Sequence, residues 1–324
     1  MLYTTEQVSD KIREGKPLLL AGDEQVLRTL PQGNWIAGTI PYFMDDEGGV
    51  CSREHVFVTE LPDFISGFEI RTHHTETLPN LLDDAPENGF TMLILPAGSA
   101  VHQAYAHDAS GYPGMFLKPV IGWIAGVHVT EIGTLSSKVV DGVTRSFSAE
   151  EAVAMHVSLP PEKMVEIDIV NVFKPGSSDS ISFPKTGFEA TTCQVGGREV
   201  NLAEYLKRTS ADTKLPLTAD YNGAVVNVSI QSADEATGVV KFYAPVFEGI
   251  PYKLAAPLAD YVETFDEIVG NNGASPVFSC NCILNYLYSG LEGKKTGSIT
   301  GPITFGEIAH ILLNQTLVRL LILG

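Results

Sequence analysis

Residues 18–40, LLLAGDEQVLRTLPQGNWIAGTI, carry the clearest fold signal in the chain. Leu18–Ala21 is a short apolar run that predicts a strand, and Gly22-Asp23 then turns the chain into a predicted helix over Glu24–Leu30. Asn34–Ile40 predicts a second strand. A strand, a helix and a strand in this order indicate a βα unit.

Strand patterns dominate the sequence beyond this unit. Phe90–Leu95 is a continuous apolar run, which is typical of a strand buried on both faces. Met164–Phe173 alternates apolar and acidic residues, as a half-exposed strand does. Helical signals are fewer, and the best are a capping box from Thr4 to Gln7 and the apolar spacing of Pro257–Val269. The sequence therefore predicts an α+β fold with mixed, mostly antiparallel sheets flanked by helices.

The loop Pro175–Asp179 is a candidate domain boundary, and further strand patterns follow it. Gly196-Gly197 lies between the predicted strands Thr191–Val195 and Glu199–Asn201, which is a hairpin signature. Ala224–Ile230 and Val239–Tyr243 are expected to pair across an acidic turn. A length of 324 residues is enough for about two domains. We expect two related domains, at residues 1–196 and 197–324.

A short motif recurs along the chain. Trp35-Ile36-Ala37-Gly38 returns unchanged as Trp123-Ile124-Ala125-Gly126, 88 residues later, and a looser copy, Ser298-Ile299-Thr300-Gly301, follows after a further 175. A copy near residue 211 would complete an even spacing, but none is present. Either each glycine ends a strand in a turn that favours positive φ, or related sheets place these strand ends around a common cleft.

Composition excludes several classes of partner. The chain has 21 basic and 39 acidic residues and a formal charge of −18. Binding to nucleic acid or to an anionic membrane surface needs basic residues, so neither partner is expected. The N-terminal segment has no apolar run of the kind that a signal peptide needs, and no stretch is long enough to span a membrane. Four scattered cysteines favour a reduced, cytoplasmic compartment.

The sequence gives little sign of metal or cofactor chemistry. His73 and His74 are adjacent, so on a strand they point to opposite faces. Cys280-x-Cys282 lacks the second pair of ligands that a zinc site needs. The acidic turn Asp45-Asp46-Glu47 lacks the glycine and the distal glutamate of a calcium loop, so we expect a solvated surface there. We expect no bound metal and no resident cofactor.

The C-terminal third resembles the FIST family, named for F-box and intracellular signal transduction proteins. In that family a strand ends in F-[SA]-C, a later segment reads like G-F-x-x-x-G-E-I, and a closing strand begins with N-x-T. The corresponding residues here are Phe278-Ser279-Cys280, Gly301–Ile308 and Asn314-Gln315-Thr316, in the same order. Weaker similarities to FIST segments extend the resemblance over nearly the whole chain, at Asn34–Thr39, Met92–Pro96, Val120–Gly126, Leu215–Leu217 and Glu248-Gly249.

The resemblance implies a non-enzymatic sensor of a small ligand, such as an amino acid or another metabolite. FIST modules are often fused to output domains, and since none is recognisable here, signalling would pass through a separate protein. Relatives usually continue F-S-C with x-G-R-R, whereas Asn281-Cys282-Ile283-Leu284 stands here, so a contact with an anionic ligand is in doubt.

Candidate ligand-binding residues follow from the motifs. Glycines allow a ligand to approach the main chain, and polar side chains orient it. The candidates are Gly38, Gly126, Cys280, Gly306, Glu307 and Asn314. Turn or cap chemistry is the alternative role for Glu307 and Asn314.

Two other functions stay open. One is a thiol-dependent enzyme that uses Cys280 as the nucleophile, with His128 or His310 as the base. The other is haem binding through a histidine such as His128, as some FIST relatives that sense nitric oxide do.

Overall fold

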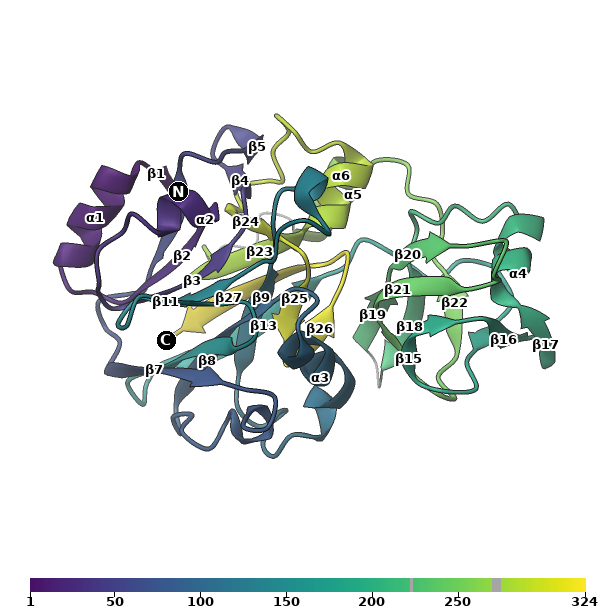
Figure 1. The fold of residues 1–324 in the computed structure, drawn as a ribbon, viewed down its shortest axis with the longest axis horizontal. Helices are drawn as coiled ribbons and strands as arrows, with labels where there is room; N and C mark the ends of the chain where they lie inside the picture. Colours follow the sequence, from purple (N-terminus) through teal and green to yellow (C-terminus); the bar gives the residue numbers. More distant parts are fainter. Residues whose placement is uncertain (222–223, 270–274) are drawn as a thin grey trace. The chain divides into compact units, whose positions relative to one another are not determined.

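The computed structural model describes residues 1–221, 224–269 and 275–324, and the chain forms two compact units (Figure 1). The first unit comprises Met1–Val170, Phe265–Leu312 and Leu317–Gly324, and the second comprises Asn171–Thr264 and Leu313–Thr316. These units divide the chain differently from the expected halves. The expected boundary after residue 196 falls in the turn of a hairpin of the second unit, where separation would break the pairing of its two strands.

The first unit contains, within the described residues, three six-stranded sheets that share one strand order. Each has an outer strand, a second strand antiparallel to it, a parallel pair, and a two-stranded hairpin. The first sheet is β1 (Leu2–Tyr3), β6 (Val56–Glu60), β2 (Leu18–Gly22), β3 (Trp35–Thr39), β10 (Val139–Asp141) and β11 (Ser146–Ser148). The second is β7 (Gly67–His73), β12 (Ala152–Ser158), β8 (Gly89–Pro96), β9 (Val120–Ala125), β25 (Glu307–Ala309) and β26 (Ile311–Leu313). The third is β13 (Met164–Val170), β27 (Leu317–Leu323), β23 (Phe278–Cys282), β24 (Gly301–Thr304), β4 (Tyr42–Asp45) and β5 (Gly48–Cys51).

The common strand order defines three repeats in the first unit: β1–β6, β7–β12, and β13 together with β23–β27. In each repeat a helix joins the parallel strands, namely α2 (Glu24–Leu27), α3 (Ala100–Asp108) and α6 (Ile283–Ser289). Each repeat gives its hairpin to another repeat's sheet: β4–β5 joins β24, β10–β11 joins β3, and β25–β26 joins β9. The three repeats therefore form a closed cycle.

The repeat structure explains the recurring motif. Trp35–Gly38 lies on β3, and Trp123–Gly126 begins on β9, which is the equivalent strand of the second repeat. Ser298–Gly301 leads into β24 and is therefore not equivalent to the other two. No copy occurs near residue 211 because most of the second unit interrupts the third repeat between β13 and β23.

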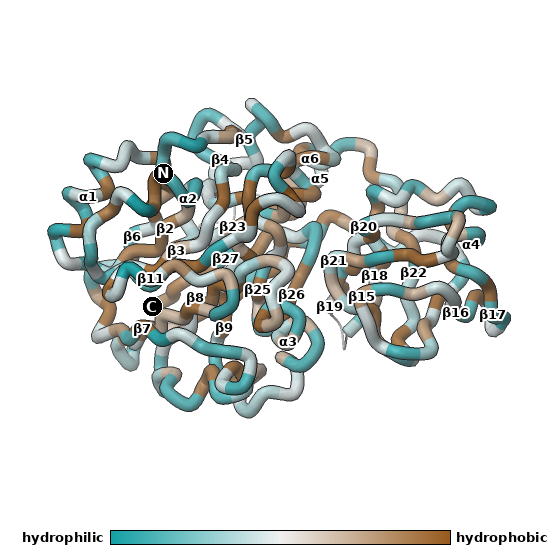
Figure 2. The backbone as a smooth tube through the Cα atoms, viewed as in Figure 1, coloured by the Kyte–Doolittle hydropathy of each residue, from teal (hydrophilic) through white to brown (hydrophobic). Residues whose placement is uncertain are grey.

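Local signals in the first unit correspond closely to its elements. Helix α1 (Thr5–Arg13) begins at the expected capping box, with the Thr4 hydroxyl accepting from the Gln7 amide. Every residue of β8 is buried, and this strand belongs to the hydrophobic interior coloured brown in Figure 2. A 3-10 turn lies at Leu78–Asn80. Further 3-10 turns lie at Ala109–Gly111 and Val129–Glu131.

The second unit holds, in its described residues, a six-stranded and a three-stranded sheet. Its elements are β14 (Ile181–Ser182), β15 (Gly187–Ala190), β16 (Thr192–Val195), β17 (Arg198–Asn201), α4 (Leu202–Arg208), β18 (Leu217–Tyr221), β19 (Ala224–Val228), β20 (Ile230–Ala233), β21 (Val240–Val246) and β22 (Tyr252–Leu254), before α5 (Tyr261–Val269). Gly196 and Gly197 have φ of 56° and 79°, as the expected two-residue hairpin turn requires. The second expected hairpin is partly wrong, because β19 pairs with β18 and it is β20 that pairs with β21.

The α+β class is confirmed, with mixed and mainly antiparallel sheets and few helices. In the part of the chain that the structure describes, no helix is long and apolar enough to cross a membrane.

Candidate functional site

The strand ends that carry the two exact copies of the recurring motif lie together, whereas one interpretation of the sequence had placed all three copies around a common cleft. The Gly126 amide donates to the Thr39 carbonyl at 2.7 Å, and the Thr39 hydroxyl donates to the Gly126 carbonyl at 2.8 Å. These bonds join the end of β3 to the end of β9. Gly38 and Gly126 therefore belong to one junction between two sheets.

Close packing fills this junction. A Cβ atom at Gly38 would lie 2.6 Å from the Trp123 Nε1 atom, and one at Gly126 would lie 2.4 Å from the Phe305 ring. Trp123 in turn stacks on Phe278, with ring centroids 5.4 Å apart. Glycine is required at both positions because sheets and aromatic rings approach the main chain, and no ligand is needed to explain it.

Cys280 and Glu307 lie in the same buried region. Cys280 lies on β23, and its thiol donates to the Gly122 carbonyl on β9 with a separation of 3.4 Å between sulfur and oxygen. Glu307 is fully buried on β25, where it pairs with Trp123. Burial, followed by the negative charge of Glu307, raises the pKa of the Cys280 thiol well above its ordinary value. A buried thiol with a raised pKa is a poor nucleophile.

Gly306 completes the junction through its main chain. Its carbonyl accepts from the Ile124 amide at 2.8 Å and from the Thr304 hydroxyl at 3.0 Å. Five of the six candidate residues thus come together, but in a packed interior. The cavities they touch are too small for a ligand: about 30 Å³ beside Gly126 and about 10 Å³ beside Cys280.

Asn314 belongs to the second unit. Its main-chain carbonyl accepts from the Asn227 side chain at 3.2 Å, and the same amide also reaches the Gln315 carbonyl at 3.2 Å. Asn227 is held by reciprocal bonds with Asn171, at 3.0 and 3.1 Å. This buried amide network holds the main chain of Leu313–Thr316, and the Asn314 side chain itself donates to the Leu313 carbonyl at 3.1 Å.

The two histidines proposed as catalytic bases have other hydrogen-bond partners. His128 Nδ1 is 2.7 Å from the Thr130 hydroxyl, and its ring stacks on Tyr42. His310 Nδ1 is 2.7 Å from the Met115 carbonyl. The Cys280 thiol donates to the Gly122 carbonyl. The hydrogen bonds of Cys280, His128 and His310 described above therefore do not include a thiol–imidazole pair.

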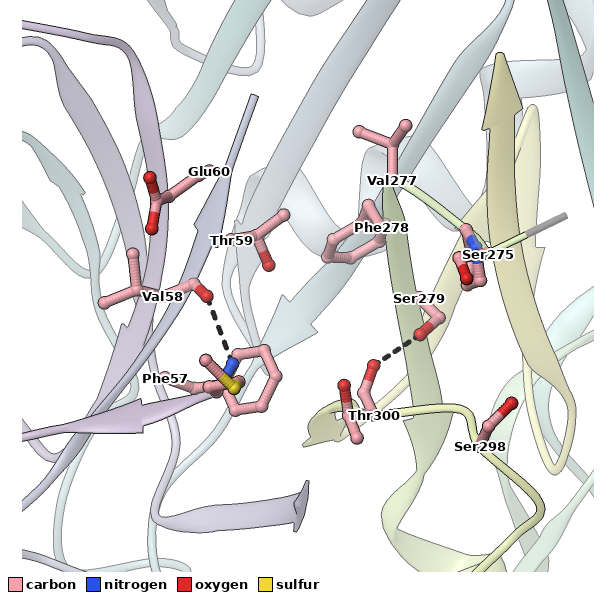
Figure 3. Close-up of a pocket in the computed structure, with 12 residues that line it drawn as sticks. Phe57, Val58, Thr59, Glu60, Ser275, Val277, Phe278, Ser279, Ser298 and Thr300 are labelled. Carbon is pink, nitrogen blue, oxygen red and sulfur yellow. Dashed lines mark hydrogen bonds between the residues drawn. The ribbon is translucent and has the colours of Figure 1, made fainter. Parts of the chain in front are cut away.

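A cleft of about 310 Å³ lies elsewhere in the first unit, between β6 and the start of β23 (Figure 3). Its walls are rich in hydroxyl groups and also present two phenyl rings and one carboxylate. The Ser279 hydroxyl donates to the Thr300 carbonyl at 2.6 Å, which ties β23 to the segment before β24. The residues around the cleft are Met1, Phe57, Val58, Thr59, Glu60, Ser275, Pro276, Val277, Phe278, Ser279, Ser298 and Thr300.

A second cavity, of about 260 Å³, shares Ser298 and Thr300 with this cleft. It is lined by Asp45 at the end of β4, by Asp46 and by Lys295. The described residues contain no group of three or more histidine, cysteine, aspartate or glutamate side chains suited to a metal ion. Hydroxyl groups and carboxylates are thus both present among the residues that line the two cavities.

Charged groups of both signs surround the cleft. Glu60 forms an ion pair of 2.6 Å with Lys11, and the hydrogen bond to Glu60 raises the pKa of Lys11. Burial lowers the pKa of the Met1 amine, while the charges of Asp45, Asp46 and Glu60 act in the opposite direction. All three carboxylates therefore act on the cleft wall at Met1.

None of the six candidate residues lines this cleft, although two of the motifs that the sequence singled out contribute residues to it. Phe278 and Ser279 belong to the F-S-C segment, and Ser298 and Thr300 to the loose third copy of the motif. Thr59 and Ser275 carry no local signal, because they meet the others only through the pairing of distant strands.

The fold and the cleft define an α+β protein with a three-repeat unit and a polar cleft at the edge of its first sheet. The chain belongs to a family of unknown function (DUF6976), whose model matches residues 3–323. No curated protein matches the chain. The resemblance to the FIST family stays a prediction.

Proposed function

We propose that this protein binds a small polar molecule in the cleft between β6 and β23, and that it acts as a FIST-like sensor which signals through a separate protein. The observation that carries the proposal is the cleft itself: about 310 Å³, within the size range of small-molecule sites, with hydroxyl groups on several walls. Neutral hydroxyls donate and accept hydrogen bonds, so they suit an uncharged polar ligand.

Two further observations support the proposal. The residues of the F-S-C segment, which carry much of the FIST resemblance, contribute Phe278 and Ser279 to the cleft wall. The Ser279 hydroxyl also donates to the Thr300 carbonyl, so the β23–β24 wall of the cleft is held together by its own hydrogen bond. We propose a cytoplasmic location as well, because all four cysteines are free thiols.

A thermal-shift screen of metabolites tests the proposal. A ligand present at 100 times its Kd stabilises the native state by about 2.7 kcal/mol. For a unit of this size that corresponds to an increase in Tm of roughly 5–11 °C. No shift with any polar metabolite class would contradict the proposal.

Variants that fill the cleft make the screen specific. Thr59→Tyr and Ser298→Tyr place a ring in the cleft from positions that are half-buried and exposed. Ser146→Tyr, at an exposed position on β11, is the matched control. We expect the two cleft variants to lose the ligand-induced shift and the control to keep it. Equal shifts in all three would place the ligand outside this cleft.

A further inference from the structure

The loop before β24 is attached to both strands of the hairpin β4–β5. The Gly293 amide donates to the Gly49 carbonyl on β5 at 2.8 Å. At the other end of the loop, Gly301 pairs with Met44 on β4. Residues 295–300 connect these two attachments, and together with the end of β4 and the turn after it they line the second cavity, of about 260 Å³. Both walls of this cavity are therefore held by main-chain hydrogen bonds.

Two polar side chains that line the second cavity have an oxygen atom without a hydrogen-bond partner among the described residues. The Asp45 Oδ1 atom is buried and accepts no bond. The Thr296 side chain is only 1% exposed, and no described residue bonds to its hydroxyl. Burying a polar oxygen without a partner is unfavourable. A ligand that donates hydrogen bonds to both oxygens would remove this cost.

The charges around the second cavity favour a positively charged donor. Its lining contains two carboxylates, those of Asp45 and Asp46, and one ammonium group, that of Lys295. The Lys295 side chain is 57% exposed, and its nitrogen lies 4.0 Å from the carboxylate of Glu47. Its charge is therefore largely in solvent and faces another carboxylate. Close to Asp45 Oδ1, a cation is attracted more strongly than a neutral donor.

We propose that the second cavity binds a small primary aliphatic amine in its ammonium form. A primary ammonium group has three hydrogen-bond donors and no acceptor. Asp45 Oδ1 and the Thr296 hydroxyl would accept two of these bonds, and the hydroxyls of Ser298 and Thr300, which also line the cavity, are available for the third. The inference goes beyond the proposed function, because it assigns a second site with its own ligand class.

The structure favours an organic amine over a metal ion. The described residues contain no cluster of three side chains suited to a metal. The volume of about 260 Å³ is several times the roughly 30 Å³ that one water molecule occupies in the liquid, so the cavity has room for a short carbon chain behind the ammonium group. Amines that also carry a carboxylate are disfavoured, since Asp45 and Asp46 would repel it.

The experiment compares three probes of similar size by NMR titration of the isotope-labelled wild-type chain. Butylamine has the charge and the donors, trimethylbutylammonium has the charge without the donors, and butanol is neutral. We expect butylamine to bind roughly tenfold more tightly than either of the others and to shift the amide signals of Asp46, Thr296 and Gly297. Equal affinity for butylamine and trimethylbutylammonium would overturn the inference, and so would displacement of butylamine by millimolar calcium.

Substitutions in the lining provide the second test. Asp45→Asn preserves the size of the side chain and removes its charge, so butylamine should bind roughly tenfold more weakly. Glu47→Gln is the matched control, because it removes one charge from the same turn without changing a residue that lines the cavity, and it should keep the wild-type affinity. Loss of affinity in the control alone would overturn the inference.

Thr296→Val separates ligand binding from a structural role. It replaces a hydroxyl that has no partner among the described residues, so the free energy of unfolding should be unchanged or higher, while butylamine binding becomes several-fold weaker. Lower stability together with unchanged affinity would show that the hydroxyl serves the fold and would overturn its role in binding.

The outcomes also separate this inference from the proposed function. Thr59 lines the cleft between β6 and β23 but not the second cavity. Butylamine should therefore still bind to Thr59→Tyr. If this variant loses butylamine binding while Asp45→Asn retains it, the amine occupies the cleft, so this inference fails and the proposed function stands. The comparison of the three probes uses the unaltered chain, so it decides the matter even where Asp45→Asn does not fold.

Discussion

Substitution of Gly38 by alanine tests the packed junction most directly. The added Cβ atom would lie 2.6 Å from Trp123 Nε1, 2.8 Å from Ile94 Cγ2 and 3.2 Å from Ala125 Cβ. All three neighbours are buried, and Trp123 is confined further by its stacking on Phe278. Inserting a methyl group into such a core costs about 1–3 kcal/mol. For a unit of this size, Tm should fall by roughly 2–12 °C.

Gly67→Ala is the matched control for this measurement. Gly67 also lies on a strand of the first unit, but a Cβ atom there would meet nothing within 4 Å. Alanine in open space restricts the unfolded chain, so the control should gain about 0.4–1 kcal/mol. Urea unfolding followed by tryptophan fluorescence measures both variants. If Gly38→Ala is as stable as Gly67→Ala, the junction is loose and the argument from close packing is refuted.

Three further predictions concern other buried groups. Asn227→Ala removes the donor to two main-chain carbonyls of the Leu313–Thr316 turn and should cost about 1–3 kcal/mol in urea unfolding; an unchanged midpoint would contradict the role of the amide network. Iodoacetamide at pH 8 should modify only Cys51 in the native protein, because the other three cysteines are buried, and it should modify all four cysteines in urea. Labelling of Cys280 in the native protein, detected by mass spectrometry, would contradict this prediction. Burial lowers the pKa of His156 to about 4 from an ordinary value of 6.5. As pH falls, His156 therefore takes up a proton in the unfolded chain before it does so in the folded chain. The free energy of unfolding should decrease by up to roughly 3 kcal/mol between about pH 6.5 and about pH 4, and it should not change through this group above pH 6.5. His156→Gln should flatten this loss, and a variant with the same pH dependence as the wild type would contradict it.

Much of the local structure could be predicted from the sequence. The capping box at Thr4 and the glycine pair at Gly196-Gly197 produce the expected helix start and hairpin, because both depend on neighbours a few residues away. The apolar run in β8 predicted a strand buried on both faces, because apolar side chains lie on both sides of such a strand. Even the distant similarity of Trp35–Gly38 and Trp123–Gly126 identified equivalent strands.

The candidate site could be predicted only in part. The motifs led to the prediction that these strand ends line a cleft, but they could not show that Trp123 packs against Gly38 and that Phe305 packs against Gly126. The hydrophobic periodicity of the sequence indicates which residues are buried. The volume available to a ligand depends instead on how the side chains of several strands pack against each other. The residues of the cleft were missed for the same reason.

What the sequence determined by itself is therefore most of the local strands, helices and turns, together with the net negative charge of the chain. Tertiary structure alone decided that three repeats exchange hairpins in a cycle, that the second unit interrupts the third repeat, and that the cleft lies between β6 and β23. The physical reason is that a strand's pattern specifies which face is buried but not which of many similar strands will supply its hydrogen bonds.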